Sequence, residues 1–248
     1  MKFALIGYGR MGHEIETVLI ERGHEVVLTV DPTPGVASVG KLSANLLEGL
    51  DAAIEFSLPA AIVENARIYA EAGIAAIVGT TGWDAQKSLV ESIVKGGKGA
   101  FLYGSNFSIG AHLMFALAAK AAQLIAPFAD YDIMVHEFHH KNKVDSPSGT
   151  ALSIAKAITQ NLPRKSKIQT KTLDRAILPD ELHVSSTRGG SFPGVHSVLV
   201  DSLADTIEIT HTARSRKGFA LGSVLAAEWL VGKSGFYRVE DFIADLTK

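Results

Sequence analysis

Short apolar runs without polar alternation recur through the first hundred residues, and segments with helical spacing separate them. Such runs are typical of parallel strands buried on both faces, because helices cover both sides of the sheet. Five strands are predicted, at Lys2–Ile6, Glu25–Val30, Ala52–Phe56, Ile74–Val78 and Ala100–Tyr103. Helices are expected from the glycines after Ile6 to about Arg22, from Pro59 to about Ala72, and over Asp84–Lys95. The first half therefore predicts an α/β domain with a doubly wound parallel sheet.

The pattern changes in the second half of the chain. It predicts a long apolar helix at Ile109–Ala126, a strand from Tyr131 into a histidine cluster, and a helix from Thr150 to about Asn161. Three strands follow, at Leu182–Arg188, Val195–Ser202 and Asp205–Thr212, with glycine- or proline-containing turns after the first. These elements predict a second, α+β domain with a mixed or antiparallel sheet. A final helix at Phe219–Val231 resembles those of the first half. We therefore expect domains at 1–107 with 213–248, and at 108–212.

Composition narrows the class of protein. The 248 residues carry a net charge of −2 and no cysteine. This balance gives no electrostatic basis for binding nucleic acid or an anionic membrane, and it excludes disulfides and thiolate chemistry. The apolar helix at 109–126 contains His112, Lys120 and Gln123, which suits a core helix better than a membrane span.

The loop after the first strand predicts a dinucleotide site. Gly7-Tyr8-Gly9-Arg10-Met11-Gly12 is a G-x-G-x-x-G sequence between a strand and a helix, and the acidic residue Asp31 ends the next strand. In this context the glycines let the backbone approach a pyrophosphate, and the helix N-terminus offers free N–H groups to its charge. The carboxylate of Asp31 accepts hydrogen bonds from the adenosine ribose. A tight strand–helix turn with an incidental aspartate is the alternative.

The surroundings of Asp31 favour NADH over NADPH. Pro32-Thr33-Pro34-Gly35 follows it, and the next lysine is Lys41, so no cation adjoins the ribose to hold a 2′-phosphate. Arg10 in the loop keeps NADPH open. Gly79-Thr80-Thr81-Gly82 and Gly104-Ser105-Asn106-Phe107 follow later strands, where sheets of this kind bind ligands. We expect them near the nicotinamide ribose and carboxamide, with ordinary turn chemistry as the alternative.

Residues 136–140 read HEFHH and match H-E-x-x-H, the zinc-peptidase sequence. That motif requires a helix, in which the two histidines lie about 6 Å apart along the axis. The β-branched residues before the match predict a strand, where the same step spans roughly 13 Å. The interpretation is therefore no metal site, with His136 structural and Glu137 either orienting a histidine or ending the strand.

The segment His139–Thr150 predicts an anion site. It joins His139, His140 and Lys143 to Ser148-Gly149-Thr150, which enters a helix. Free amides and hydroxyls at a helix N-terminus bind carboxylates, and the histidines and lysine supply protons and positive charge. With a hydride donor, these groups describe a reductase for a small carboxylate-bearing substrate with an electron-poor double bond.

The same segment resembles the dihydrodipicolinate reductase (4-hydroxy-tetrahydrodipicolinate reductase) family, whose signature is E-x-H-H-x-x-K-x-D-x-P-S-G-T-A. The resemblance extends to Gly9–Gly12, Gly79–Gly82, Asn106–Gly110, the Arg188–His196 stretch, and Ile209–His211 with Arg216. One departure is the glycine loop, which is one residue shorter than G-x-x-G-R-M-G, the form in many members.

The resemblance implies a role for each matching residue. His139 is expected as general acid/base and Lys143 as its catalytic partner, while His140, Ser148, Gly149 and Thr150 hold the substrate carboxylates. The reduced nicotinamide is expected to give hydride to C4 of the ring with loss of the 4-hydroxyl, yielding tetrahydrodipicolinate. The cofactor-binding residues are expected to be those of the first loop (Gly7, Tyr8, Gly9, Arg10, Met11, Gly12), Asp31, Gly79, Thr80, Thr81, Gly104, Ser105, Asn106, Phe107 and Arg216.

The resemblance also implies a cytoplasmic homotetramer in lysine and diaminopimelate biosynthesis, assembled through the second-domain sheet. Two other functions stay open from the residues alone. One is another Rossmann dehydrogenase for a small carboxylate-bearing substrate, and the other is an NADH sensor without catalysis. A sensor gains nothing from His139 and Lys143.

Overall fold

The computed structural model describes residues 1–247, and the chain divides into two compact units. Unit 1 comprises Met1–Ile109 and the segment from Arg216 onward, whereas unit 2 comprises Gly110–Ser215. The chain thus leaves unit 1 once and returns to it. Among the described residues, no helix is both long and apolar enough to cross a membrane.

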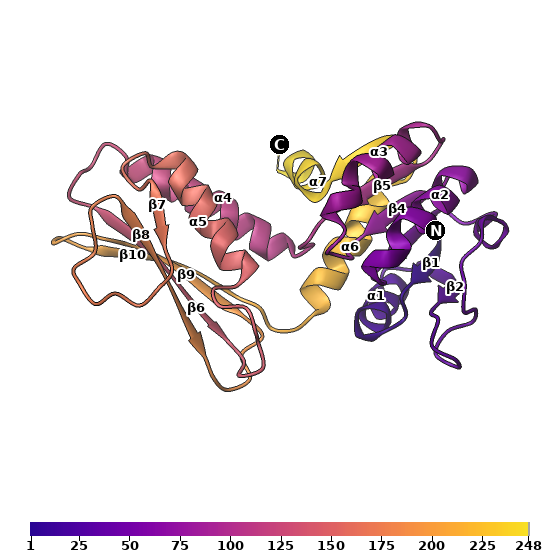
Figure 1. Ribbon diagram of the computed structural model, residues 1–248, viewed down its shortest axis with the longest axis horizontal. Coiled ribbons are helices and arrows are strands. Elements are labelled where there is room, and N and C mark those ends of the chain that lie inside the picture. The colour runs from indigo at the N-terminus through magenta and orange to yellow at the C-terminus, as the bar shows by residue number, and fades with distance from the viewer. Residues whose placement is uncertain (248) are drawn as a thin grey trace. The chain divides into compact units, whose positions relative to one another are not determined.

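Unit 1 is built on a six-stranded sheet in which every pairing is parallel (Figure 1). Its strands are β1 (Lys2–Ile6), β2 (Glu25–Val30), β3 (Ala52–Glu55), β4 (Ala75–Val78), β5 (Ala100–Tyr103) and β11 (Gly235–Arg238). They lie in the order β11-β5-β4-β3-β1-β2, so the direction of strand succession reverses between β1 and β3. Sheets of this kind bind ligands outside the carboxyl ends of the strands at such a reversal.

Helices cover both faces of this sheet. On one face lie α1 (Arg10–Glu21), α6 (Lys217–Leu230) and α7 (Val239–Leu246), and on the other lie α2 (Ile62–Ala72) and α3 (Lys87–Lys95). Successive strand residues alternate between the two cores, with Phe3 and Leu5 in the first and Ala4 and Ile6 in the second. Burial of each large apolar side chain stabilises the fold by about 1.5–3 kcal/mol.

The predicted doubly wound sheet is confirmed, and the elements differ mainly at their ends. The helices predicted from Pro59 and Asp84 each begin with a 3-10 turn, at Pro59–Ala61 and Asp84–Gln86, and a further 3-10 turn lies at Ala44–Leu47. Two elements of this unit were not predicted, the edge strand β11 and the helix α7. Both are short, and β11 pairs only with β5, which precedes it by more than a hundred residues.

Unit 2 holds a five-stranded mixed sheet in the order β10-β9-β6-β8-β7. Its strands are β6 (Asp132–His139), β7 (Lys167–Gln169), β8 (Glu181–Arg188), β9 (Val195–Asp201) and β10 (Thr206–Thr212). β6 runs antiparallel to β9 and parallel to β8. The sequence predicted a mixed or antiparallel sheet, and the sheet is mixed, with the three-residue β7 as an unpredicted edge strand.

Two helices, α4 (Ile109–Ile125) and α5 (Gly149–Asn161), pack on one face of this sheet (Figure 1). Because side chains alternate along a strand, Ile133, Val135, Glu137 and His139 of β6 all face these helices and are buried. The odd-numbered side chains of β6 thus enter the core, and the last two of them are ionisable.

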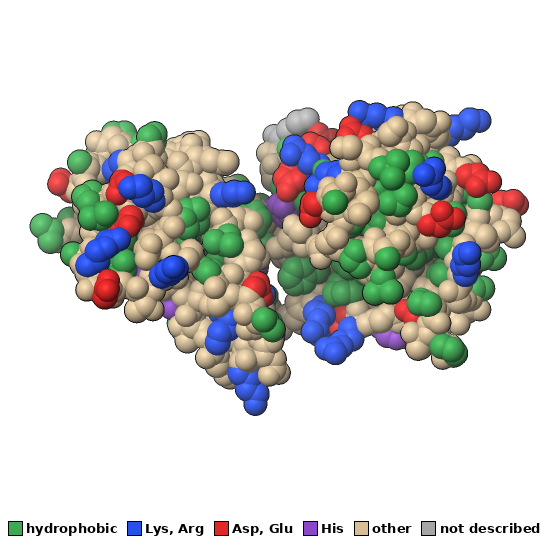
Figure 2. Space-filling model, viewed as in Figure 1, with side chains coloured by type: hydrophobic (Ala, Val, Ile, Leu, Met, Phe, Trp, Pro, Cys, Tyr) green, Lys and Arg blue, Asp and Glu red, His purple; other side chains and the backbone are tan. Residues whose placement is uncertain are grey.

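The other face of the sheet has no helix packed on it among the described residues. Met134, His136 and Phe138 of β6 project there, beside Leu199 of β9, and line a hollow of about 330 Å³. On the face drawn in Figure 2, basic and acidic side chains are interspersed on both units.

Candidate active site

The glycine loop lies at the reversal point of the unit 1 sheet. Gly9, Arg10, Met11 and Gly12 line a cavity of about 420 Å³. The other residues that line this cavity are Phe56, Ser57, Pro59, Gly79, Thr80 and Thr81. They follow β1, β3 and β4, so the carboxyl ends of three neighbouring strands meet at one cavity. The structure thereby brings together most of the first-loop residues with the predicted Gly79–Thr81 stretch.

Gly7 makes the sharp turn that this loop requires. Its φ is +86°, and a Cβ atom at this position would lie 2.2 Å from the carbonyl oxygen of Phe56. Its N–H donates to the Val30 carbonyl at 2.8 Å. Gly9, by contrast, has open space where a Cβ would be, and it precedes the first residue of α1. The loop therefore presents an accessible helix N-terminus, which suits a phosphate group.

Asp31 follows β2 and is tied to the same loop. Its carboxylate accepts hydrogen bonds from the Thr33 N–H at 2.9 Å and the Tyr8 N–H at 3.0 Å. The bond from Thr33 contributes most to lowering the pKa of Asp31, with a smaller contribution from Tyr8. An ionised carboxylate therefore stands at the end of β2, next to the loop.

The remaining predicted cofactor residues fall in several places. Gly104 and Ser105 line a second hollow of about 320 Å³ that shares Thr80 and Thr81 with the first cavity. The Phe107 side chain is buried in the core of unit 1, and Asn106 Oδ1 accepts the Ser108 N–H at 2.8 Å. Arg216 is exposed just before α6.

Sequence reasoning missed the contribution of the loop after β3. Ser57 lines the cavity, its N–H donates to Thr80 Oγ1 at 2.8 Å, and its hydroxyl bonds to Glu55. Glu55 is fully buried and also accepts hydrogen bonds from Asn65 and Tyr69, both at 2.7 Å. Burial raises the pKa of Glu55. This loop follows a strand that borders the reversal point, and that position in the sequence could have predicted that the loop lines the cavity.

The H-E-x-x-H match lies on strand β6, as predicted, and so lacks the helical geometry of a zinc peptidase. His136 projects from the opposite face to Glu137 and His139, and its Nδ1 lies 2.6 Å from Ser185 Oγ. Its ring packs edge-on against Phe138. This histidine is a structural residue of the uncovered sheet face.

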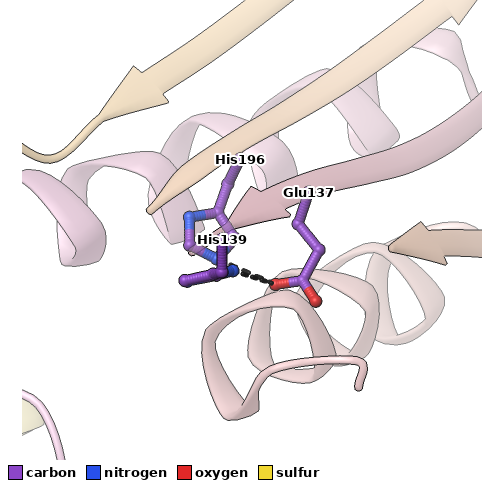
Figure 3. Close-up of side chains that lie close together, drawn as sticks. All are labelled: Glu137, His139 and His196. Atoms are coloured by element: carbon purple, nitrogen blue, oxygen red, sulfur yellow. Dashed lines mark ion pairs between the residues drawn. The ribbon is translucent and has the colours of Figure 1, made fainter. Parts of the chain in front are cut away.

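On the covered face, a row of polar side chains crosses the sheet. Cross-strand pairing sets Glu137 of β6 beside Ser186 of β8 on one side and His196 of β9 on the other, and His196 pairs with His211 of β10. His139 lies two residues beyond Glu137 on the same face. The rings of His139 and His196 are 5.1 Å apart (Figure 3). Four strands thus contribute to one buried ionisable cluster.

Glu137 is fully buried, and its two oxygens have different surroundings. Oε1 accepts hydrogen bonds from the Ser148 N–H at 2.9 Å, Ser186 Oγ at 2.8 Å and Arg188 Nη2 at 2.8 Å. Burial raises the pKa of Glu137, but contacts with His196, Ser148 and Arg188 outweigh it and hold the pKa well below the ordinary range. The carboxylate is therefore ionised inside the core.

His139 ends β6 and is buried to 6% exposure. Burial is the largest cause of a pKa lowered to about 4, and the charges of His196, Lys143 and Arg188 lower it further, whereas Glu137 raises it. In the free protein this imidazole is therefore neutral at neutral pH. The backbone of Gly194 adjoins it, because a Cβ at Gly194 would lie 2.9 Å from His139 Nε2.

The loop after β6 carries the other predicted catalytic group. Lys143 Nζ lies 2.8 Å from the Asp145 carboxylate, and the Lys143 side chain is 24% exposed. Arg188 donates to the Asp145 carbonyl at 2.6 Å and thereby ties this loop to Glu137. The His140 N–H donates to the Phe192 carbonyl at 2.9 Å, and the Nδ1 atom of His140 is buried without a hydrogen-bond partner.

Ser148, Gly149 and Thr150 form the N-terminus of α5. The Ser148 hydroxyl caps the helix by accepting the Ala151 N–H at 3.1 Å, and it also lies 3.2 Å from His196 Nε2. Gly149 has open space where a Cβ would be. The helix N-terminus therefore lies directly beside the histidine cluster, as required for a carboxylate held near a proton donor.

One ligand atom each of Glu137, His139 and His196 lies within 4.8 Å of the others, so these three residues form a possible donor set for a metal ion. Zinc accepts such nitrogen and oxygen ligands. The guanidinium of Arg188, however, already neutralises this carboxylate at 2.8 Å, and its charge opposes a second cation. We therefore interpret the three residues as an acid–base cluster.

Comparison with known proteins finds the same family along the two parts of the chain. A family model described as dihydrodipicolinate reductase, N-terminus, matches residues 1–107, and one described as dihydrodipicolinate reductase, C-terminus, matches residues 110–243. A 4-hydroxy-tetrahydrodipicolinate reductase of Christiangramia forsetii is 40% identical over 248 residues, which is 100% of both chains. One of Archaeoglobus fulgidus is 33% identical, covering 98% of this chain and 100% of the relative.

Solved structures support the fold. A dipicolinate-bound dihydrodipicolinate reductase from Paenisporosarcina sp. TG-14 superposes with a TM-score of 0.76 at 23% identity, covering 97% of this chain and 98% of the other. A scyllo-inositol dehydrogenase from Lactobacillus casei, with NAD(H) and scyllo-inositol bound, gives a TM-score of 0.56 at 12% identity, covering 98% and 93%. These likenesses bear on the architecture.

Proposed function

Since the chain belongs to the dihydrodipicolinate reductase family and is an NAD(P)H-dependent oxidoreductase of lysine and diaminopimelate biosynthesis, we propose how its residues divide the work. The reaction reduces 4-hydroxy-tetrahydrodipicolinate to tetrahydrodipicolinate. Unit 1 binds the cofactor and unit 2 binds the substrate. The observation that carries this division is the ionisable cluster beside the N-terminus of α5.

The cofactor is held by the cavity at the reversal point of the unit 1 sheet. Gly9–Gly12 lie against the pyrophosphate, where the first turn of α1 offers N–H groups and a positive helix end. Thr80 and Thr81 supply hydroxyls, and Gly104 and Ser105 extend the site along the sheet. When bound, the reduced nicotinamide supplies the hydride of the reaction.

The substrate carries two carboxylates, and unit 2 has matching groups for them. Gly149 and Thr150 stand at the start of α5, where the positive end of the helix favours a carboxylate, with Ser148 fixed in place as the cap. His140 and Lys143 add hydrogen-bond donors and positive charge from the loop before this helix. The binding of a dianion also raises the pKa of His139, because negative charge near an imidazole favours its protonated form.

Reduction of the ring adds one hydride and one proton and releases one water. His139 provides the proton, from the imidazolium that forms when the dianion is bound. Lys143 stabilises the negative charge that develops on the ring, as a fixed cation. This division follows from the surroundings of the two groups, because His139 is buried beside Glu137 while Lys143 is partly exposed on a loop.

NADH is the preferred cofactor. The carboxylate of Asp31 is ionised and lies at the end of β2, where it accepts hydrogen bonds from a ribose and repels a 2′-phosphate. Replacing Asp31 by Ser is expected to raise KM for NADH about tenfold and to lower KM for NADPH, because the repulsion of the 2′-phosphate is removed. Glu25→Gln, at an exposed carboxylate on the same strand, serves as the control.

The uncovered face of the unit 2 sheet is the surface through which the protein forms a homotetramer. Met134, Phe138 and Leu199 line its hollow and are partly exposed, and an apolar patch of this kind indicates an interface. We place the enzyme in the cytoplasm, in keeping with a cysteine-free biosynthetic enzyme. Light scattering of the purified protein measures the assembly, and Phe138→Glu is expected to reduce it to smaller species.

The activity is tested by following oxidation of NADH and NADPH with substrate made in situ from pyruvate and aspartate semialdehyde by the preceding synthase. Turnover is expected with both cofactors and a higher kcat/KM for NADH. NADH binding without turnover would instead support another substrate for the same anion site.

A further inference from the structure

Glu137 is a buried carboxylate, and its Oε2 atom faces two histidine rings. While Oε1 accepts three hydrogen bonds, Oε2 has no hydrogen-bond partner. It lies 3.1 Å from His139 Nδ1 and 3.5 Å from His196 Nε2 (Figure 3). The contact with His139 has ion-pair distance without hydrogen-bond alignment. A buried acceptor without a donor costs about 1–3 kcal/mol, so this oxygen favours an imidazole that carries a proton.

The other charges around His139 are positive. Arg188 approaches from β8, Lys143 from the loop after β6, and His196 from β9, and all three oppose a proton on His139. His211 of β10 stands behind His196 at a ring distance of 6.5 Å, and Asp145 is bound to Lys143. Glu137 is the acidic group in direct contact with the His139 ring among residues 1–247.

The rest of the cluster holds Glu137 in one orientation. Arg188 and Ser186 come from the neighbouring strand, and the Ser148 N–H comes from the helix that carries the anion site. Three donors on Oε1 direct Oε2 toward the two histidines. The same network therefore links the substrate-binding helix end to the imidazole, through Ser148 and Glu137.

We propose that Glu137 is the positioning residue of the proton donor: it orients His139 and stabilises the positive charge that the imidazole carries when the dicarboxylate substrate is bound. This role rests on the function proposed above and deepens it. Glu137 touches neither substrate nor cofactor in this role and acts through His139. Carboxylates behind catalytic imidazoles act in this way on unrelated folds.

The test is the pH dependence of kcat in Glu137→Gln, which keeps the shape of the side chain and removes its charge. Without the carboxylate, the imidazolium is less stable. The alkaline limb of the kcat profile is therefore expected to move to lower pH, by about one unit or more. Activity above that limb then falls about tenfold or more, while KM changes less than about threefold. Asp174→Asn, at an exposed carboxylate of the same unit, is expected to leave the limb in place.

A purely structural role predicts another result. If Glu137→Gln lowers kcat by the same factor at every pH, with an unmoved limb, the proposal is overturned. Where Glu137→Gln does not fold, Glu137→Asp keeps the charge but withdraws it from both rings. A smaller shift of the limb in the same direction is then expected, and its absence would equally overturn the proposal.

A measurement without turnover separates this proposal from the proposed function. In protein with labelled histidines and bound dipicolinate, nuclear magnetic resonance gives the pKa of His139, with His139→Gln identifying the signal. The pKa is expected to be lower in Glu137→Gln than in the parent protein. If Glu137→Gln lowers the pKa of His139 but the parent protein does not reduce the substrate, only the proposed function is refuted. If the pKa of His139 is the same in both proteins, the role of Glu137 is refuted.

Discussion

The binding regions of the two units are built by different means. In unit 1 the cavity is formed by backbone and small side chains where β1, β3 and β4 end, and its shape depends on glycine. In unit 2 the site is formed by buried ionisable side chains that meet from four strands and one helix end. The glycine loop of unit 1 is one contiguous segment and can be found in the sequence, whereas the cluster of unit 2 depends on the register of the sheet.

The largest effect on activity is expected at the proposed catalytic residues of unit 2. His139→Gln and Lys143→Ala should each lower kcat by at least about 100-fold, because one removes the proposed proton donor and the other removes the proposed fixed charge. Steady-state kinetics and NADH binding measure this, and NADH affinity should change less than about twofold because these residues lie in unit 2. Lys141→Ala, at an exposed lysine of the same loop, is the matched control. Full activity in both variants would remove the catalytic assignment.

A change in the glycine loop should instead act on folding. Gly7→Ala places a Cβ 2.2 Å from the Phe56 carbonyl at a φ of +86°, so unfolding in urea should show a loss of about 3 kcal/mol. Gly9→Ala, where space is open, should cost less than about 1 kcal/mol but weaken NADH binding. Equal stability of the two variants would contradict the proposed difference between the two glycines.

Burial of His139 should make stability depend on pH. The folded pKa of about 4 lies below the ordinary value of 6.5, so the unfolded chain binds more protons between these values. Stability is therefore retained above about pH 6.5 and lost as the pH falls toward about 4, by roughly 2 kcal/mol from this group. Urea unfolding across this range should give a flatter curve for His139→Gln than for the parent protein. Parallel curves would show that His139 titrates normally in the folded state.

The smallest effect is expected at His136. This histidine lies on the uncovered face, bonded to Ser185, so His136→Ala should change kcat less than about twofold. A metal chelator should likewise leave activity unchanged. A large loss of activity in either experiment would support a zinc site at HEFHH. It would also show that both faces of β6 contribute to activity.

The fold was largely accessible from the sequence because strands and helices alternate with distinct periods. The elements that escaped, β7, β11 and α7, span eight residues or fewer, and β11 pairs with a strand more than a hundred residues earlier in the chain. The uninterrupted apolar runs of unit 1 also made its parallel sheet the natural interpretation.

The sites were accessible to different degrees. The glycine loop and the segment from His139 to Thr150 are each continuous in the sequence, so the spacing of their residues was enough to predict two binding sites. The pairing of Glu137 with His196 joins positions about sixty residues apart, and that of His196 with His211 depends on the register of a hairpin. No pattern in one strand specifies those neighbours, so the contacts of Glu137 could not be predicted without the pairing of the strands.

The return of the chain to unit 1 affects the order in which the protein is made. The core on one face of the unit 1 sheet includes Ala220, Val224, Ala227 and Leu230 of α6, and β11 completes the sheet edge. During synthesis that core stays incomplete until after residue 230 has emerged, whereas unit 2 is continuous from Gly110 to Ser215. Unit 2 can therefore fold on the ribosome before unit 1, whose first part precedes it in the sequence. A chain truncated after Ser215 would leave an apolar sheet face exposed, as a substrate for chaperones rather than an enzyme.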